Sequence, residues 1–140
     1  MTTLNFISEA DNTRFFTFGS TAITLVSKAA FTQLVGAVGA TADPTRGHLA
    51  FFTKDCSRSP AGGVNVTASN TDAQSTAAYF IGAIPSKTAT RTDLSGTGYV
   101  ANVPTGAVTV TGKYGTMRMG SQTVLVRAGA LTTFNVTPTP

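Results

Sequence analysis

The sequence predicts a mostly β protein, an antiparallel β-sandwich of seven to eight strands with an N-terminal strand segment and one short helix. Apolar residues recur at every second position in four runs, 98–103, 107–111, 123–127 and 131–136. This alternation is typical of strands that cover a core with one face. Turn residues separate the runs at 93–96, 104–106, 114–115 and 128–129. Many short strands divided by turns favour a sandwich over helical or parallel folds.

The strands of the sandwich are predicted between His48 and the end of the chain, at 48–53, 63–69, 78–83, 88–92, 98–103, 107–113, 122–127 and 131–137. Asp93 can accept hydrogen bonds from the amides of its own turn, which Gly96 can close. Pro104 and Gly106 suit a three-residue hairpin between Val103 and Ala107, because Pro presets φ and Gly reaches positive φ.

Residues 1–46 are predicted to form strands and a helix that pack on the 47–140 sandwich, so that the two parts make one compact unit. Strands are expected at 4–7, 13–18 and 22–26. A helix is expected over about 28–38, because one apolar stripe at helical spacing is made by Phe31, Leu34, Val35 and Val38. Ser27 can cap its first turn and Gly39 can end it.

Charge is sparse and dispersed in this chain. The net charge is +4, and charged residues make up 11% of the 140 residues, against about 25% in average domains. The ten basic residues are scattered singly, so no nucleic-acid partner is expected. A surface with so little charge has little electrostatic repulsion against neighbouring proteins, which favours a module of a larger secreted protein or an assembly subunit. No apolar stretch approaches the ~20 residues of a membrane span, so no membrane insertion is expected.

Few residues offer catalytic or metal chemistry. Cys56 is the only cysteine, which excludes an intrachain disulfide, and we expect a buried or semi-buried thiol. His48 is the only histidine and is expected at a strand end with its ring hydrogen-bonded locally. A hydrolase that pairs His48 with Asp43 or Asp55 is a remote alternative, since no G-x-S-x-G elbow appears. Loop residues that could bind calcium are expected to cap turns instead, so no metal or cofactor is predicted; these are Asn70, Asp72 and Asp93.

Adjacent aromatic residues suggest contact positions. Neighbours along a strand point to opposite faces of the sheet. One ring of each pair can fill the core, and the other must be covered by the N-terminal segment or remain exposed as a contact patch. The aromatic residues predicted to make protein contacts are Phe16, Phe18, Phe52 and Tyr79.

Four motifs occur in an ordered series: AGGVNVT at 61–67, TDLSG at 92–96, NVPTGAVTV at 102–110 and VRAG at 126–129. Over about residues 47–138 this series resembles the carboxypeptidase regulatory-like domain, an Ig-like or transthyretin-like β-sandwich. Val108 stands where that family usually has Tyr, and the segment 70–86 is longer than is typical. The resemblance implies a non-catalytic domain of secreted or surface proteins, with no catalytic residue to carry over and an extracellular or cell-surface location.

The sequence therefore favours a non-catalytic structural, adhesive or assembly module of a secreted or surface bacterial-type protein that acts through protein–protein contacts. Its expected partners are other domains of the same protein or copies of itself, with no small-molecule substrate and no cofactor. The alternative is a self-assembling subunit of a filament, shell or surface layer. The remote alternative is the hydrolase that uses His48.

Overall fold

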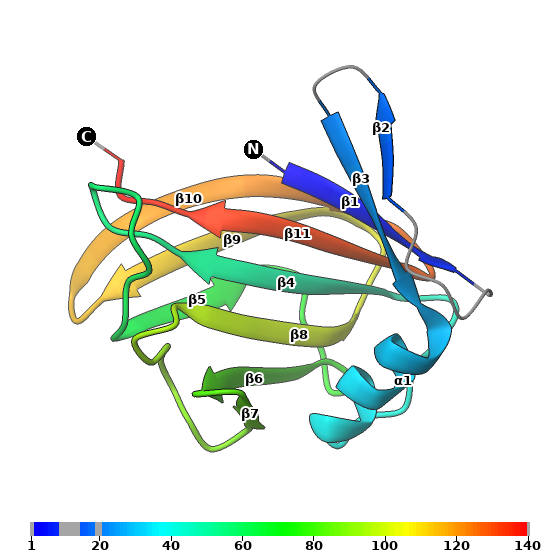
Figure 1. The fold of residues 1–140 in the computed structure, drawn as a ribbon. Coiled ribbons are helices and arrows are strands. Elements are labelled where there is room, and N and C mark those ends of the chain that lie inside the picture. Colours follow the sequence, from blue (N-terminus) through cyan, green and yellow to red (C-terminus); the bar gives the residue numbers. More distant parts are fainter. Residues whose placement is uncertain (1, 9–14, 19–20, 140) are drawn as a thin grey trace.

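The computed structural model of the chain describes the backbone of residues 2–8, 15–18 and 21–139, and the side chains of residues 27 and 29–139. The chain folds into two β-sheets and a short helix (Figure 1). The predicted fold class, a mostly β sandwich with one helix, is confirmed. No helix in the described part of the chain is long and apolar enough to cross a membrane.

The two layers are built from the part of the chain that begins at Gly47. Its strands are β4 (Gly47–Thr53), β5 (Val64–Ala68), β6 (Thr76–Ile81), β7 (Ile84–Ser86), β8 (Thr97–Val103), β9 (Gly106–Tyr114), β10 (Met117–Val126) and β11 (Ala130–Val136). The larger sheet has the order β2-β3-β1-β11-β4-β8-β6-β7, and the smaller sheet has the order β10-β9-β5.

The N-terminal strands extend the larger sheet at its β11 side. They are β1 (Thr2–Ser8), β2 (Phe15–Phe18) and β3 (Thr21–Ser27). β1 pairs antiparallel with β11 and parallel with β3, while β2 pairs antiparallel with β3. The β4 and β11 strands also run parallel. The larger sheet is thus mixed, which the prediction of a purely antiparallel sandwich did not include.

The helix α1 (Lys28–Ala37) has the caps that the sequence predicts. The Ser27 hydroxyl accepts a hydrogen bond from the Ala30 N–H at 3.2 Å, and Gly39 adopts a φ of +67°. The apolar stripe of α1 packs on the outer face of the larger sheet through Phe31, Val35 and Val38. It therefore covers one part of that face with a second, smaller core.

The main core lies between the sheets and follows the alternation of the strands. The larger sheet contributes residues such as Leu49, Phe51 and Phe134, and the smaller sheet contributes mainly valines: Val64, Val108, Val110, Val124 and Val126. Each fully buried side chain of this size stabilises the fold by roughly 1.5–3 kcal/mol. This core holds both sheets in place and so positions their outer surfaces.

Two details of the predicted turns are wrong. The chain reverses at Gly82 (φ +63°), so that β7 pairs with β6 at 84–86. The strand expected at 88–92 is instead part of the connection from β7 to β8 within the larger sheet, and Thr92 exchanges backbone hydrogen bonds with Gly63 and Val64 beside β5. Pro104 and Gly106 do not close a hairpin, because β8 and β9 belong to different sheets and Val103 and Val108 enter the core from opposite layers.

The turn at 93–96 forms as predicted. The Asp93 carboxylate accepts a hydrogen bond from the Ser95 N–H at 2.8 Å, and the Asp93 carbonyl accepts one from the Gly96 N–H at 3.0 Å. Gly96 has a φ of +67°, the left-handed conformation that a glycine adopts without strain.

Candidate protein-contact surface

His48 is enclosed between the larger sheet and α1. Its Nδ1 accepts hydrogen bonds from the Tyr99 hydroxyl at 2.9 Å and the Asn102 N–H at 3.4 Å, and the Phe31 ring packs edge-on with centroids 4.5 Å apart. The side chain is only 1% exposed. Burial lowers the pKa of His48 to about 4, because the charged ring would lose its hydration. A neutral, enclosed ring of this kind is suited to holding α1 on the sheet.

The acids that might assist His48 are used in their own turns. Asp43 accepts hydrogen bonds from the Thr45 N–H and hydroxyl, at 2.8 and 2.7 Å. Asp55 accepts bonds from the Ser57 and Ser59 N–H groups, both at 2.9 Å. These bonds lower the pKa of each carboxyl group. Among the described hydrogen bonds, neither Asp43 nor Asp55 binds the His48 ring, which is the contact that a Ser, His and Asp relay requires.

The loop residues considered for calcium lie in separate arrangements. Asp72 forms a bidentate ion pair with Arg46, with N–O distances of 2.9 and 2.8 Å, and the pKa of Asp72 falls to about 2 because of this partner. Asn70 donates to the Ala107 carbonyl, and Asp93 caps its turn. Within the described ranges, no group of three His, Cys, Asp or Glu side chains could hold a metal ion.

Cys56 is exposed, so the expectation of a buried or semi-buried thiol is wrong. It lies in the loop between β4 and β5. In this loop the Asp55 carboxylate stabilises a tight turn by accepting hydrogen bonds from the Ser57 and Ser59 N–H groups. The turn is closed by its own polar groups. The loop therefore needs no buried apolar side chain, and the thiol points to solvent.

Tyr79, one of the four aromatic residues predicted to make protein contacts, is buried and so is not available for such a contact. It is 6% exposed, and its ring packs against Phe51 with centroids 5.8 Å apart. The Tyr79 hydroxyl accepts a hydrogen bond from the Val66 N–H at 2.9 Å and donates one to the Val66 carbonyl at 3.1 Å. The Tyr79 hydroxyl thus satisfies the Val66 N–H and carbonyl on the edge of β5 that faces away from β9. The side chains of Phe16 and Phe18 lie outside the described residues.

Phe52 is the predicted contact aromatic that lies at the surface, with 39% of its side chain exposed. Phe51 points into the core, so Phe52 points outward from β4. Its neighbours across the sheet are Thr97 of β8 and Asn135 of β11. Phe80 of β6 lies opposite Pro85 of β7 and continues this row beside β8; it is half-buried, because it also packs against the cluster beneath α1. We call these five residues the uncovered strip: Asn135, Phe52, Thr97, Phe80 and Pro85.

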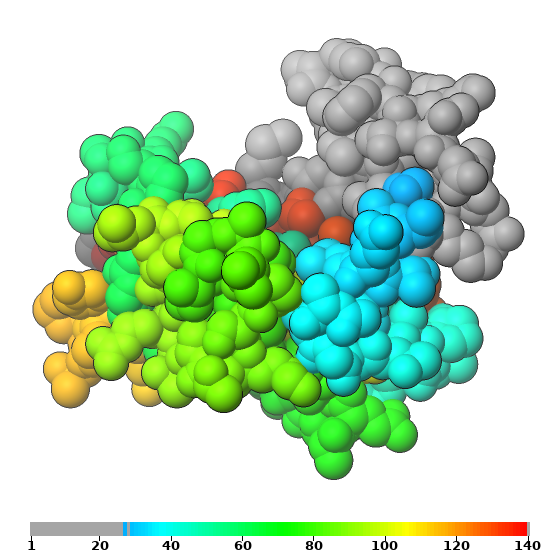
Figure 2. Space-filling model, turned by 60° about the horizontal axis from the view of Figure 1, so that its bottom comes forward, coloured from blue at the N-terminus to red at the C-terminus, as the bar shows by residue number. Residues whose placement is uncertain are grey.

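The uncovered strip adjoins the part of the outer face that α1 occupies. α1 packs over Tyr99, Ala101 and Leu131, which lie farther along the same face. Figure 2 shows α1, in blue to cyan, beside the green β6 and β7 region on one side of the molecule. The helix thus covers one end of this face, while the part around Phe52 remains open among the described side chains.

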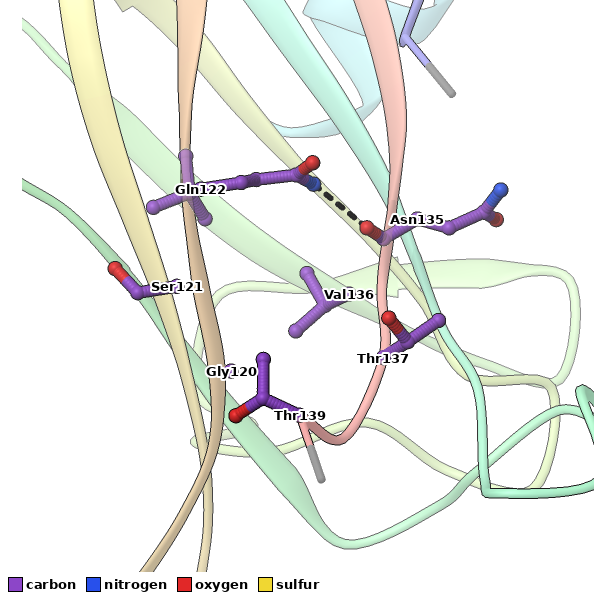
Figure 3. Close-up of a pocket in the computed structure, with 8 residues that line it drawn as sticks. Gly120, Ser121, Gln122, Asn135, Val136, Thr137 and Thr139 are labelled. Atoms are coloured by element: carbon purple, nitrogen blue, oxygen red, sulfur yellow. Dashed lines mark hydrogen bonds between the residues drawn. The ribbon is translucent and has the colours of Figure 1, made fainter.

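A polar groove meets the strip at Asn135. A cavity of about 200 Å³ separates β10 from the end of β11, and across it the Gln122 side-chain amide donates to the Asn135 carbonyl at 2.6 Å (Figure 3). In the same view the Asn135 side chain points away from Gln122. A second cavity of about 530 Å³ continues along Lys54, Cys56 and Arg58. Amide, hydroxyl and cationic groups of this kind can bind a polypeptide backbone or polar side chains.

Sequence reasoning missed a second group of exposed residues. Large apolar side chains protrude from the turns at one end of the sandwich: Ile81, Ile84, Leu94, Tyr114 and Met117. A signal was present for two of them, because Ile81 and Tyr114 continue the inward-facing alternation of their strands beyond the last buried residue.

Comparisons with known proteins gave no match to the chain, whether with protein-family models, with curated proteins or with solved structures.

Proposed function

We propose that this chain is a non-catalytic structural or adhesive module of a secreted or surface bacterial-type protein, and that the uncovered strip around Phe52 makes its protein–protein contacts. Its partners are other domains of the same protein or copies of the chain. The resemblance to carboxypeptidase regulatory-like domains supports the same class of protein.

The observation that carries this proposal is the exposure of Phe52 beside a helix that covers one end of the same face. A phenylalanine on the outer face of a sheet keeps apolar surface in water unless a neighbour covers it. Here Phe52 lies in a row with Phe80 and Pro85, and two hydrogen-bonding residues, Thr97 and Asn135, flank it. An aromatic centre with polar groups around it is the usual composition of a protein contact.

Four of the side chains considered for catalysis or metal binding have structural partners, which also supports the proposal. His48 binds Tyr99, Asp72 binds Arg46, and Asp55 and Asp93 cap turns. Because these groups are engaged in the fold, surface contact is the chemistry that the geometry favours.

The test compares the chain with two variants by light scattering over a concentration series, both alone and joined to its natural neighbours. Phe52→Ser should weaken any association, because it removes the aromatic centre of the strip. Leu125→Ser is the matched control, since Leu125 is also exposed on a strand but lies on β10 of the smaller sheet. If the parent protein binds nothing in either form, or if both variants weaken binding equally, the proposal is wrong.

Self-assembly through the edges of the larger sheet is the second candidate. The observation that favours it is the position of β2 at the end of the strand order, where its outer side has no strand neighbour in the described sheet. The opposite edge, β7, is a poor template because Pro85 lacks the N–H that an added strand would need. Electron microscopy of the purified protein tests this candidate, which predicts ordered polymers.

A further inference from the structure

The exposed apolar residues at the turns of the sandwich form one connected surface. The Asp93 carboxylate accepts a hydrogen bond from the Gly82 N–H, which joins the turn of Ile81 and Ile84 to the turn of Leu94. A Cβ on Gly62 would lie 2.9 Å from the Asp93 carbonyl, and one on Gly63 would lie 2.9 Å from the Tyr114 ring. The backbone at 62–63 thus links Leu94 to the β9 and β10 turn. We call the surface formed by these exposed residues the turn end: Ile81, Ile84, Leu94, Tyr114 and Met117.

The turn end projects its apolar groups farther than the uncovered strip does. Leu94 is 89% exposed and Met117 is 66% exposed. Tyr114 lies directly opposite Met117 across the turn between β9 and β10, and Ile81 lies opposite Ile84 across the turn between β6 and β7. In Figure 1 these turns lie at the end of the sandwich away from α1. Three separate turns therefore each present apolar groups at one end of the fold.

Cations flank these apolar tips. Lys113 and Arg118 lie directly opposite each other, on the face of the hairpin away from Tyr114 and Met117. Both are exposed, and the salt bridges between described residues include neither. Two like charges in this position repel each other. An anionic surface would relieve that repulsion, and the same charges oppose contact between the turn ends of two copies.

The carboxylate of Asp93, next to Leu94 in the turn end, accepts hydrogen bonds within the fold. Asp93 accepts bonds from the Ser95 N–H and hydroxyl as well as from Gly82, and these bonds lower the pKa of its carboxyl group. Arg91 adds another exposed cation two residues before Asp93. Asp93 stays ionised and contributes one negative charge, against one positive charge each from Lys113, Arg118 and Arg91, so the net charge of these four groups is positive.

From this arrangement we propose that the turn end docks on the surface of an anionic lipid bilayer. Apolar tips on separate turns can each enter a fluid interface, whereas a rigid protein partner would need a matching pocket for every tip. Tyrosine and cations beside apolar groups suit the boundary between headgroups and acyl chains. The contact is peripheral and is independent of the uncovered strip, so each proposal can fail without the other.

The test is co-sedimentation of the full chain with vesicles of phosphatidylcholine alone or with about 30 mol% phosphatidylserine. We expect binding to the anionic vesicles that weakens as salt rises from about 0.05 to 0.5 M. The double variant Leu94→Ser and Met117→Ser should bind the vesicles at least about tenfold more weakly than the parent, because both changed side chains lose apolar area. The double variant Lys113→Gln and Arg118→Gln should lose the preference for anionic vesicles.

Matched controls lie outside the turn end. Leu125→Ser removes a 51% exposed leucine, Arg127→Gln removes an exposed cation, and Phe52→Ser changes the uncovered strip. All three should bind vesicles as the parent does. The proposal is overturned if the parent stays in the supernatant with anionic vesicles at low salt, or if the controls lose binding as much as the turn-end variants. Binding to poly-glutamate without binding to vesicles would also overturn it, in favour of an acidic protein surface.

Discussion

The Tyr99 hydroxyl donates a hydrogen bond to Nδ1 of His48 at 2.9 Å, beneath α1 and out of contact with solvent. The two rings stack with centroids 6.0 Å apart, and Phe31 of α1 closes the other side of the imidazole. The residue that a sequence reader would examine first for catalysis is therefore a packing element between the helix and the larger sheet.

This arrangement makes stability depend on pH. The pKa of His48 is about 4 in the folded chain, against 6.5 for an imidazole in water, so between these values the unfolded chain binds a proton that the folded chain does not. Stability should therefore fall as pH drops from about 6.5 to 4, by at most about 3 kcal/mol. Urea unfolding at a series of pH values measures this loss.

The control for that prediction is His48→Gln, which cannot titrate. Asp43 is the charged group that acts on His48, and it is retained in the variant. The variant should be less stable at neutral pH, yet its stability should change less between pH 6.5 and 4. An equal loss in both proteins would assign the pH dependence to the carboxylates instead.

Asn102 should be a sensitive position for a different reason. Its side chain accepts a bond from the Asp43 N–H at 3.0 Å and donates one to the Thr41 carbonyl at 2.8 Å, and its φ is +54°. Asn102→Ala removes both bonds and leaves a residue that resists this conformation, so we expect a loss of roughly 2–4 kcal/mol. Asn102→Gly should lose about 1 kcal/mol less, because glycine tolerates positive φ. Denaturant unfolding of both variants decides the point, and equal losses would contradict the role of the backbone angle.

The Tyr79 hydroxyl should protect the free edge of β5. Tyr79→Phe removes its two bonds to Val66 and should cost about 1–3 kcal/mol. It should also speed hydrogen exchange at the Val66 amide. Tyr114→Phe is the matched control, since the Tyr114 ring is exposed, and it should leave both quantities unchanged. Unaltered exchange at Val66 in Tyr79→Phe would show that another group satisfies the edge.

Two glycines should respond in opposite ways to alanine. A Cβ on Gly98 would lie 2.1 Å from the Phe51 ring, so Gly98→Ala should displace a core aromatic and cost about 1–3 kcal/mol or more. Gly36 lies in α1 with nothing within 4 Å of a new Cβ, so Gly36→Ala should stabilise the protein by roughly 0.5–1 kcal/mol. Thermal unfolding of both variants measures the difference in sign.

The features that local pattern determines could be predicted from the sequence. The stripe of Phe31, Val35 and Val38 identified α1 and its buried face, and the Asp93 turn followed from side-chain chemistry within four residues. The alternation in β9 predicted that Val108 and Val110 face the core. These features depend on near neighbours in the chain, so no knowledge of the topology was needed.

Features that depend on which strands become neighbours could not be predicted. The turn at Pro104 has the residues of a hairpin, but the burial of Val103 and Val108 from opposite layers makes it a connection between sheets. Tyr79 was expected at the surface because its alternation allowed either face, and only the position of Val66 shows why its hydroxyl is buried. Within the candidate surface, Phe52 was predicted, whereas the groove at Asn135 arises from segments distant in sequence.

The most direct test of the proposed contact is hydroxyl-radical footprinting of the chain, free and in its natural assembly. The proposal predicts that Phe52, Phe80 and Pro85 become protected in the assembly while Leu125 reacts as before. Unchanged reactivity across the strip, with protection confined to other surfaces, would contradict it.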